Sequence, residues 1–259
     1  MKHTPIIPAA EDFPAALHPY LHGRIYDSSS SPEARVYYLE EAGLYLKRGA
    51  RTALQKEAEM TSFFYKNGLS VEVLAYLSEE EEDWLLTRKG IGEDATHPRY
   101  LADGRRLAAT LGEALRALHE TPQAGCPIPC RTADYLQTVE TRAAAGFFDP
   151  SYLPPGIMLT KEEALACVRE AAPHLSSRVL LHGDFCLPNV LLDGWRPSAY
   201  IDLGAAGIGD RHIDLFWGAW SLCYNLGTDA CRNVFLEAYG RDRAEDELLL
   251  AIAAAECFG

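Results

Sequence analysis

His182-Gly183-Asp184-Phe-Cys-Leu-Pro-Asn189 is the most informative stretch of this chain, and Ile201-Asp202-Leu203-Gly204 follows it, with Asp202 thirteen residues after Asn189. Short apolar runs at residues 179–182 and 199–202 flank the polar segment and favour strands. Two carboxylates and one carboxamide therefore stand in order, each next to a short extended run. Asp and Asn are common turn residues, so each alone has a plain structural explanation, but the ordered set indicates a site.

The spacing within this segment favours phosphoryl transfer. An Asp, four intervening residues and an Asn, with an Asp-x-Gly further on, match the catalytic loop of protein kinases. A carboxylate such as Asp184 orients an incoming hydroxyl and accepts its proton. The amide oxygen of Asn189 and the carboxylate of Asp202 are hard ligands, suited to a Mg²⁺ ion that bridges phosphates.

The first third of the chain supplies a matching pair. Lys47 ends a predicted strand, and Glu57 lies ten residues further on, in the first turns of a predicted helix. A strand lysine that contacts phosphates and is held by a helix glutamate completes the kinase arrangement. A serine loop, residues 28–31, lies where hydroxyl and N–H groups can donate to phosphate oxygens. The chain has no G-x-x-x-x-G-K-[ST] motif, which disfavours a P-loop enzyme.

The apolar pattern changes near residue 90. Before it, β-forming residues predict strands at 35–39, 44–47, 71–77 and 84–87, a helix at 53–67, and a solvated turn in the acidic run 79–83. After it, we predict helices at 100–119, 215–228 and 245–256. The expected fold is α+β with two lobes, a small β-rich N-terminal lobe at 1–88 and a larger, mainly helical lobe at 89–259.

Composition narrows the class of protein. The 259 residues include 24 Lys and Arg against 37 Asp and Glu, a formal net charge of −13, which disfavours a nucleic-acid partner. No run reaches the roughly 18–20 apolar residues of a membrane helix, so we expect no membrane partner. Seven scattered cysteines predict reduced thiols in a cytoplasm. The close pair Cys126 and Cys130 lacks the further ligands of a zinc site. We expect a monomer or a weak dimer.

The chain resembles bacterial aminoglycoside O-phosphotransferases of the 3′ type, which share the protein-kinase-like fold. The resemblance lies in Leu181–Asp193, in Tyr200-Ile-Asp-Leu-Gly204 and in Gly209-Asp-Arg-His-Ile-Asp214. Weaker matches at Leu54-Gln-Lys-Glu-Ala58, Trp84-Leu-Leu86 and Leu115-Arg-Ala-Leu-His119 extend it from about residue 20 to the C-terminus. It implies a kinase that uses ATP or GTP with Mg²⁺ to phosphorylate a hydroxyl of a cationic small molecule, and so confers antibiotic resistance.

The resemblance also implies a role for individual residues. Asp184 is the expected catalytic base, and Asn189 and Asp202 are the expected Mg²⁺ ligands. The expected nucleotide contacts are Lys47 with its partner Glu57, Ser30 or Ser31 at the β-phosphate, and the hinge at Thr87 to Gly90, which includes Arg88. His182 and Asp214 are expected to support the loop.

The expected acceptor side departs from the family. Tyr224-Asn225 stand where two acids are usual, and Trp220 replaces an arginine. The C-terminal acids are reduced to Glu256, in Ala255-Glu256-Cys257-Phe258 before Gly259. The remaining candidate acceptor contacts are Asp149, Tyr224, Glu256 and Phe258. Trp217, Trp220 and Tyr224 are either an aromatic wall of the acceptor site or ordinary helix packing.

Three functions remain open from the sequence. The first expectation is phosphorylation of the 3′-hydroxyl of an aminoglycoside. The second is a kinase of a different hydroxylated molecule, such as an amino alcohol, a sugar or a natural product. The third is a nucleotide-binding pseudokinase, against which the intact set of Asp184, Asn189 and Asp202 argues.

Overall fold

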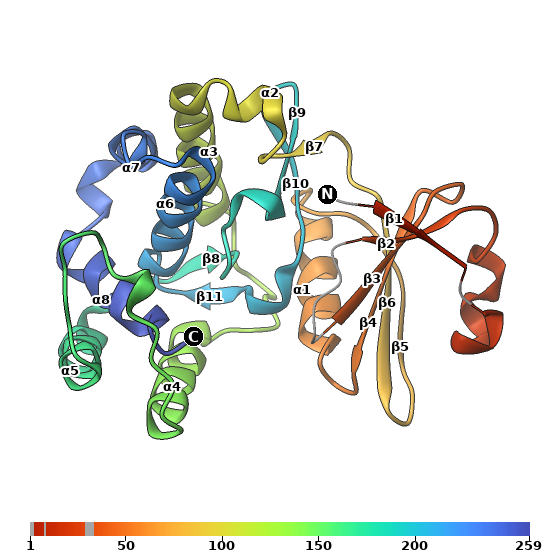
Figure 1. Ribbon diagram of the computed structural model, residues 1–259, viewed down its shortest axis with the longest axis horizontal. Coiled ribbons are helices and arrows are strands. Elements are labelled where there is room, and N and C mark those ends of the chain that lie inside the picture. The colour runs from red at the N-terminus through yellow and green to blue at the C-terminus, as the bar shows by residue number, and fades with distance from the viewer. Residues whose placement is uncertain (1–2, 8, 29–33) are drawn as a thin grey trace.

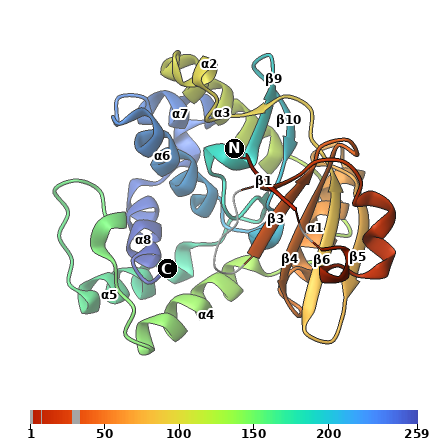
Figure 2. The same cartoon turned by 45° about the vertical axis from the view of Figure 1, so that its right-hand side comes forward.

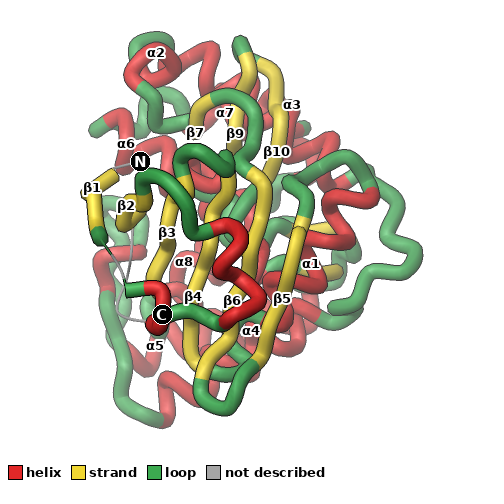
Figure 3. The backbone as a smooth tube through the Cα atoms, turned by 90° about the vertical axis from the view of Figure 1, so that its right-hand side faces the viewer, coloured by secondary structure: helices red, strands yellow, loops and turns green. Residues whose placement is uncertain are grey.

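An antiparallel sheet forms the N-terminal lobe, with strand order β1-β2-β3-β4-β6-β5 (Figures 1 and 3). The structure, a computed structural model, describes residues 3–7, 9–28 and 34–259. The strands of this sheet are β1 (His3–Ile6), β2 (Ile25–Ser28), β3 (Ala34–Leu39), β4 (Leu44–Ala50), β5 (Val73–Ser78) and β6 (Glu82–Arg88). The strands predicted at 35–39 and 44–47 are confirmed and form a hairpin: β3 pairs with β4, and Gly43 takes a positive φ of 63° in the turn between them.

Alternating side chains give this sheet one apolar face. Leu39, Leu44, Leu46 and Leu86 are buried there, and they pack with a short N-terminal 3₁₀ segment that brings in Leu17. Because successive strand residues point to opposite faces, Lys47 projects away from this cluster. The sheet therefore directs Lys47 toward the other lobe.

Helix α1 (Gln55–Lys66) lies between the sheet and the C-terminal lobe (Figure 1). Its first turns pack Ala58 against Leu85 of β6. Its later turns place Phe63 and Phe64 in the core of the other lobe. One helix thus belongs to two cores, which holds Glu57 at the junction of the lobes.

Helices make up most of the C-terminal lobe (Figure 2). They are α2 (Pro98–Leu101), α3 (Gly104–His119), α4 (Arg131–Ala144), α5 (Lys161–Ala171), α6 (His212–Leu226), α7 (Arg232–Tyr239) and α8 (Asp246–Glu256). The leucines of α3 at 107, 111, 115 and 118 are all buried, as their spacing predicts. The uncharged run after Leu215 is the buried helix α6, also as predicted.

Two small sheets carry the polar segment between these helices. In one, β9 (Val190–Asp193) lies between β7 (Glu93–Asp94) and β10 (Arg196–Tyr200). In the other, β8 (Val179–Leu181) pairs with β11 (Gly207–Gly209). Both strand pairs are antiparallel, so the loops around Asp184 and Asp202 are anchored at each end by hydrogen-bonded strands.

Two local predictions are wrong. The acidic run 79–83 is not all a solvated turn, because β6 begins at Glu82 and Asp83 is fully buried. The Asp83 carboxylate accepts hydrogen bonds from the Leu54 amide and the Tyr76 hydroxyl, each at 3.0 Å. The single helix at 100–119 is two helices. Asp103 interrupts it and caps α3, accepting from the Arg106 amide at 3.1 Å.

Over the described parts of the chain, no helix has both the length and the apolar character needed to cross a membrane.

We predict that Asp83→Ala lowers the free energy of unfolding by about 1–3 kcal/mol, because a buried amide and a buried hydroxyl lose their acceptor. Urea unfolding followed by tryptophan fluorescence measures this, since Trp84 is the next residue and is buried. Glu79→Ala, at an exposed position just before β6, is the control and should change the value by less than about 0.5 kcal/mol. Equal effects of the two substitutions would contradict the assigned role.

Candidate active site

The loop after β8 is shaped by one glycine and one buried carboxylate. Gly183 has a φ of +84°, and a Cβ there would lie 1.9 Å from the Ala205 carbonyl oxygen, so only glycine fits. The carboxylate of Asp214, on α6, accepts from the amides of His182 and Gly183 at 2.8 and 2.7 Å. These contacts fix the backbone that presents Asp184.

Asp214 is itself held by a histidine. His119 Nε2 lies 3.0 Å from Asp214 Oδ2, and His119 Nδ1 lies 2.8 Å from the Tyr239 hydroxyl. Burial lowers the pKa of His119, although the Asp214 charge opposes this shift. The ring is therefore neutral near pH 7, with Nε2 donating to the carboxylate and Nδ1 accepting from Tyr239.

Asn189 lies beside Asp184, and the loop that carries both is tied to the segment before Asp202. The Asn189 amide nitrogen donates to Asp184 Oδ2 at 2.9 Å and to its carbonyl at 3.1 Å. His182 Nε2 donates to the Ile201 carbonyl at 3.0 Å, which ties the loop to the strand before Asp202. Asp202 then takes a left-handed conformation, φ 60° and ψ 58°, unusual for a residue other than glycine. That turn places its carboxylate in the cleft between the lobes.

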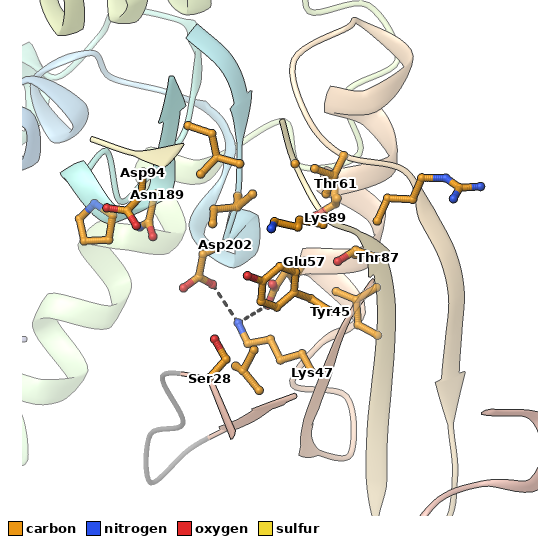
Figure 4. Close-up of a pocket in the computed structure, with 18 of the residues that line it drawn as sticks. Ser28, Tyr45, Lys47, Glu57, Thr61, Thr87, Lys89, Asp94, Asn189 and Asp202 are labelled. Carbon is orange, nitrogen blue, oxygen red and sulfur yellow. Dashed lines mark hydrogen bonds and ion pairs between the residues drawn. The ribbon is translucent and has the colours of Figure 1, made fainter. Parts of the chain in front are cut away.

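Lys47 joins the two lobes across this cleft (Figure 4). Its ammonium lies 2.7 Å from Glu57 Oε2 and 2.9 Å from Asp202 Oδ1. Burial disfavours the charged form, but the two carboxylates outweigh burial and raise the pKa of Lys47 above its usual value. Lys47 is therefore cationic at every physiological pH.

A cavity of about 350 Å³ opens beside Lys47 and is lined by both lobes. Residues 87–90 form one wall, and Asn189 and Asp202 lie on another. The exposed Arg88 side chain pairs with half-buried Glu72. A Cβ at Gly90 would meet Leu191 Cδ1 at 2.2 Å, so a larger residue there would displace the Leu191 side chain. The structure thus brings Arg88 and Gly90 to the cavity that Lys47, Glu57, Asn189 and Asp202 also line.

The donor set suits Mg²⁺. The Asp202 side chain is 52% exposed, and Asn189 uses its amide nitrogen for Asp184, which leaves its amide oxygen as the metal-binding group. Among the described residues, no cluster of three or more His, Cys, Asp or Glu side chains is arranged to hold a metal, Cys126 and Cys130 included. A site built from one carboxylate and one amide requires further oxygen ligands, which phosphates supply.

Glu256 lies close enough to Asp184 to feel its charge, and it is not among the residues that line the cavity. It is only 7% exposed and accepts from the Tyr135 hydroxyl at 2.8 Å. Burial raises the pKa of Glu256 to about 7; hydrogen bonds with Tyr135 and Trp217 oppose the shift, and the Asp184 charge adds to it. Glu256 is therefore a carboxyl group that titrates near neutral pH beside Asp184.

The other predicted acceptor contacts differ in their exposure. Asp149 is exposed and caps a 3₁₀ turn, Pro150–Tyr152, while its amide donates to the Cys257 carbonyl at 2.6 Å. Tyr224 is exposed on α6. The Phe258 side chain is 1% exposed and packs with Val139, Ala143 and Ala164, so it lies in the core rather than on an open surface. Ser30 and Ser31 lie outside the described residues.

Several residues of the site were not predicted from the sequence. Tyr45, Thr61 and Asp94 line the cavity. Ser221 accepts from the Leu187 amide at 3.0 Å and so supports the polar loop. Tyr45 lies two residues before Lys47 on β4 and Thr61 four residues after Glu57 on α1, so strand and helix periodicity could have marked both. Ser221, in contrast, reaches the loop from α6, an element remote in the chain. The histidine at 119 belonged to a weak family match, yet its contact with Asp214 required the fold.

The two lobes meet at a lysine that a helix glutamate holds, and the C-terminal lobe carries an Asp-x₄-Asn loop. This arrangement defines a kinase-like phosphotransferase. Similarity to known proteins agrees with this class. The model of the phosphotransferase enzyme family matches residues 33–249, and the chain belongs to that family.

Individual relatives extend over nearly the whole chain. A probable aminoglycoside 3′-phosphotransferase of Lactococcus lactis is 44% identical over 251 residues, 96% of each chain. The crystal structure of an aminoglycoside-3′-phosphotransferase of type VIII superposes with a TM-score of 0.71, 25% identity, and coverage of 90% of this chain and 91% of that one. A Streptomyces rimosus aminoglycoside phosphotransferase, solved with ADP and streptomycin, has the same fold, with a TM-score of 0.71, 22% identity, and coverage of 86% of this chain and 90% of that one.

We predict that Gly183→Ala destabilises the protein more than Gly125→Ala does. Both glycines have positive φ, but a Cβ at Gly125 meets nothing within 4 Å, whereas at Gly183 it meets the Ala205 backbone. The Gly125 variant should lose about 1 kcal/mol from backbone strain alone, and the Gly183 variant at least about 2 kcal/mol more. Thermal unfolding measures both, and equal losses would mean that the close approach to Ala205 is unimportant.

Proposed function

We propose that this protein transfers the γ-phosphoryl group of ATP or GTP to the 3′-hydroxyl of an aminoglycoside antibiotic. Two pairs carry the proposal: Lys47 with Asp202 and Asn189 with Asp184, each at 2.9 Å. Lys47, Asn189 and Asp202 line the same cavity. The similarity to aminoglycoside 3′-phosphotransferases supports this acceptor and this position. The proposed place of action is the cytoplasm, and the proposed consequence is antibiotic resistance.

In this proposal the lobe at 1–88 and the hinge hold the nucleotide. Lys47 has three N–H donors, of which Glu57 and Asp202 use two, so the third is available to phosphate oxygens. Glu57 keeps Lys47 in place. Backbone groups of Thr87 to Gly90 meet the purine, and Ser30 or Ser31 donates to the β-phosphate.

The C-terminal lobe, residues 89–259, supplies the metal site and the base. Asn189 and Asp202 are the proposed Mg²⁺ ligands; the ion, when bound, neutralises charge on the β- and γ-phosphates. Asp184 orients the acceptor hydroxyl and takes its proton as the new O–P bond forms and the bond from the γ-phosphorus to the bridging oxygen breaks. The Asn189 hydrogen bond holds one Asp184 oxygen, which leaves the other for the hydroxyl.

Glu256 is the proposed contact for an ammonium group of the acceptor. Its position near Asp184 and its burial favour a strong pairing with a cation, because a charge in a poorly solvated site interacts strongly. Asp149 is the proposed second acidic contact, at the rim of the same region, because its amide is hydrogen-bonded to Cys257.

The first test is a nucleoside-diphosphate release assay over kanamycin- and neomycin-class drugs, with ATP and GTP. We expect turnover on at least one drug, with the phosphate mapped to the 3′-hydroxyl by NMR. Asp184→Asn keeps the shape and removes the base, so turnover should fall by at least about 100-fold while nucleotide binding survives. Turnover on neutral sugars or amino alcohols alone would replace the acceptor, and nucleotide binding with no turnover on any acceptor would indicate a pseudokinase.

The second test uses pH. Protonation of Glu256 as pH falls through about 7 removes its charge, so KM for a cationic drug should rise as pH is lowered from 8 to 6. Glu256→Gln should have a raised KM whose only remaining pH dependence in this range is that of the drug itself. The drug's own titration is common to both proteins, so the difference between their profiles isolates Glu256. Parallel profiles would exclude Glu256 from acceptor binding.

A further inference from the structure

Four aromatic rings form a continuous surface beside Glu256. We call them the aromatic cluster: Tyr152, Trp217, Trp220 and Tyr224. Trp220 lies 5.6 Å from Trp217, 5.7 Å from Tyr152 and 5.2 Å from Tyr224, measured between ring centroids. Three members lie on α6, and Tyr152 comes from the 3₁₀ turn that packs on α8.

The aromatic cluster reaches the reacting groups. Helices α6 and α8 pack against each other (Figures 1 and 2), and Glu256 is the last residue of α8. Trp217 hydrogen-bonds Glu256, whose pKa is in turn raised by the Asp184 charge. Burial raises the pKa of the Tyr152 hydroxyl, and the charges of Glu256 and Asp149 act in the same direction. The cluster thus continues from the proposed cation contact outward to the surface.

Packing against the core explains the positions of three of the four rings but not that of Tyr224. Trp217, Trp220 and Tyr152 are half-buried against the core. Tyr224, in contrast, is 73% exposed, and its ring lies stacked on Trp220 with an interplanar angle of 10°. A large aromatic ring left in water contributes little to stability, since stability comes from burial. The stacked pair is therefore a flat surface open to a ligand.

This stretch of α6 has no charge of its own. From Leu215 to Leu226 the sequence contains no Asp, Glu, Lys or Arg. A cation that binds along it meets π faces and neutral oxygens rather than carboxylates. Ammonium groups are attracted to the faces of Trp and Tyr, and the C–H face of a saturated ring packs on the same surface.

We propose that the aromatic cluster is the specificity-determining surface for the acceptor. This inference rests on the proposed function. The acceptor that fits the aromatic cluster is a saturated, hydroxylated ring that carries an ammonium group. The ring lies on Tyr224 and Trp220, and the ammonium group is directed toward Glu256. Ring stacking and cation–π attraction here take the place of a second ion pair.

Steady-state kinetics with kanamycin and ATP test the surface. Tyr224→Ala should raise KM for kanamycin about 5- to 30-fold and leave KM for ATP unchanged, while Tyr224→Phe, which keeps the ring, should stay within about 2-fold. Tyr65→Ala is the matched control, because Tyr65 is also exposed but lies on α1. A Tyr224→Ala variant with an unchanged KM for kanamycin would overturn the proposal.

Binding without turnover separates this inference from the proposed function. Tryptophan fluorescence is titrated with kanamycin, without nucleotide, in the full-length protein. We expect a saturable change that is lost in Trp220→Phe and weakened in Tyr224→Ala. It should be retained in Trp195→Phe, because Trp195 packs elsewhere, against Tyr100.

A neutral disaccharide, trehalose, is the second ligand in this titration. It should bind at least about 10-fold more weakly than kanamycin, because it lacks the cation. Equal binding of trehalose, or a kanamycin titration unaffected by Trp220→Phe and Tyr224→Ala, would overturn the aromatic surface as a cation site. A positive titration with no phosphate transfer to any aminoglycoside would instead overturn the proposed function and leave the surface intact.

Discussion

The buried carboxylate of Asp214 is the group on which the geometry of the site depends. It receives the amides of His182 and Gly183 and the ring of His119 at 2.7–3.0 Å. A buried carboxylate is costly unless such donors compensate it, and here three N–H groups do so. Because two of the three belong to the loop itself, the loop has one backbone path, and Asp184 and Asn189 emerge from it in fixed positions.

The cleft between the lobes is organised by a second charge. Lys47 is paired with Glu57 of its own lobe and with Asp202 of the other, so one ammonium group joins the sheet, α1 and the segment after β10. Helix α1 contributes to the same junction through apolar packing in both cores. The polar junction and the apolar one act in parallel, and the lobes are consequently held at the distance that leaves the cavity between them.

Two regions near the polar loop differ in chemistry. The cavity is rich in charged groups, among them Lys47, Glu57 and Asp202. The region around Glu256 combines this single buried carboxyl with rings of α6 and of the turn at Tyr152. The net charge of −13 therefore says little about this region, because α6 from Leu215 onward is uncharged.

Local sequence was enough to predict the strands of the hairpin, the apolar stripe of α3 and the buried helix α6. It also marked Asp184, Asn189 and Asp202 as a set. Each of these features depends on periodicity or spacing within a short stretch of the chain. Local sequence misassigned Asp83, whose burial depends on Leu54 and Tyr76, and missed the Asp103 cap that divides α2 from α3. Only the tertiary structure decided the pairing of Lys47 with Asp202, the burial of Phe258 and the approach of Tyr152 to α6. The physical reason is that these contacts join residues up to 155 positions apart, whose meeting depends on how the helices and sheets pack.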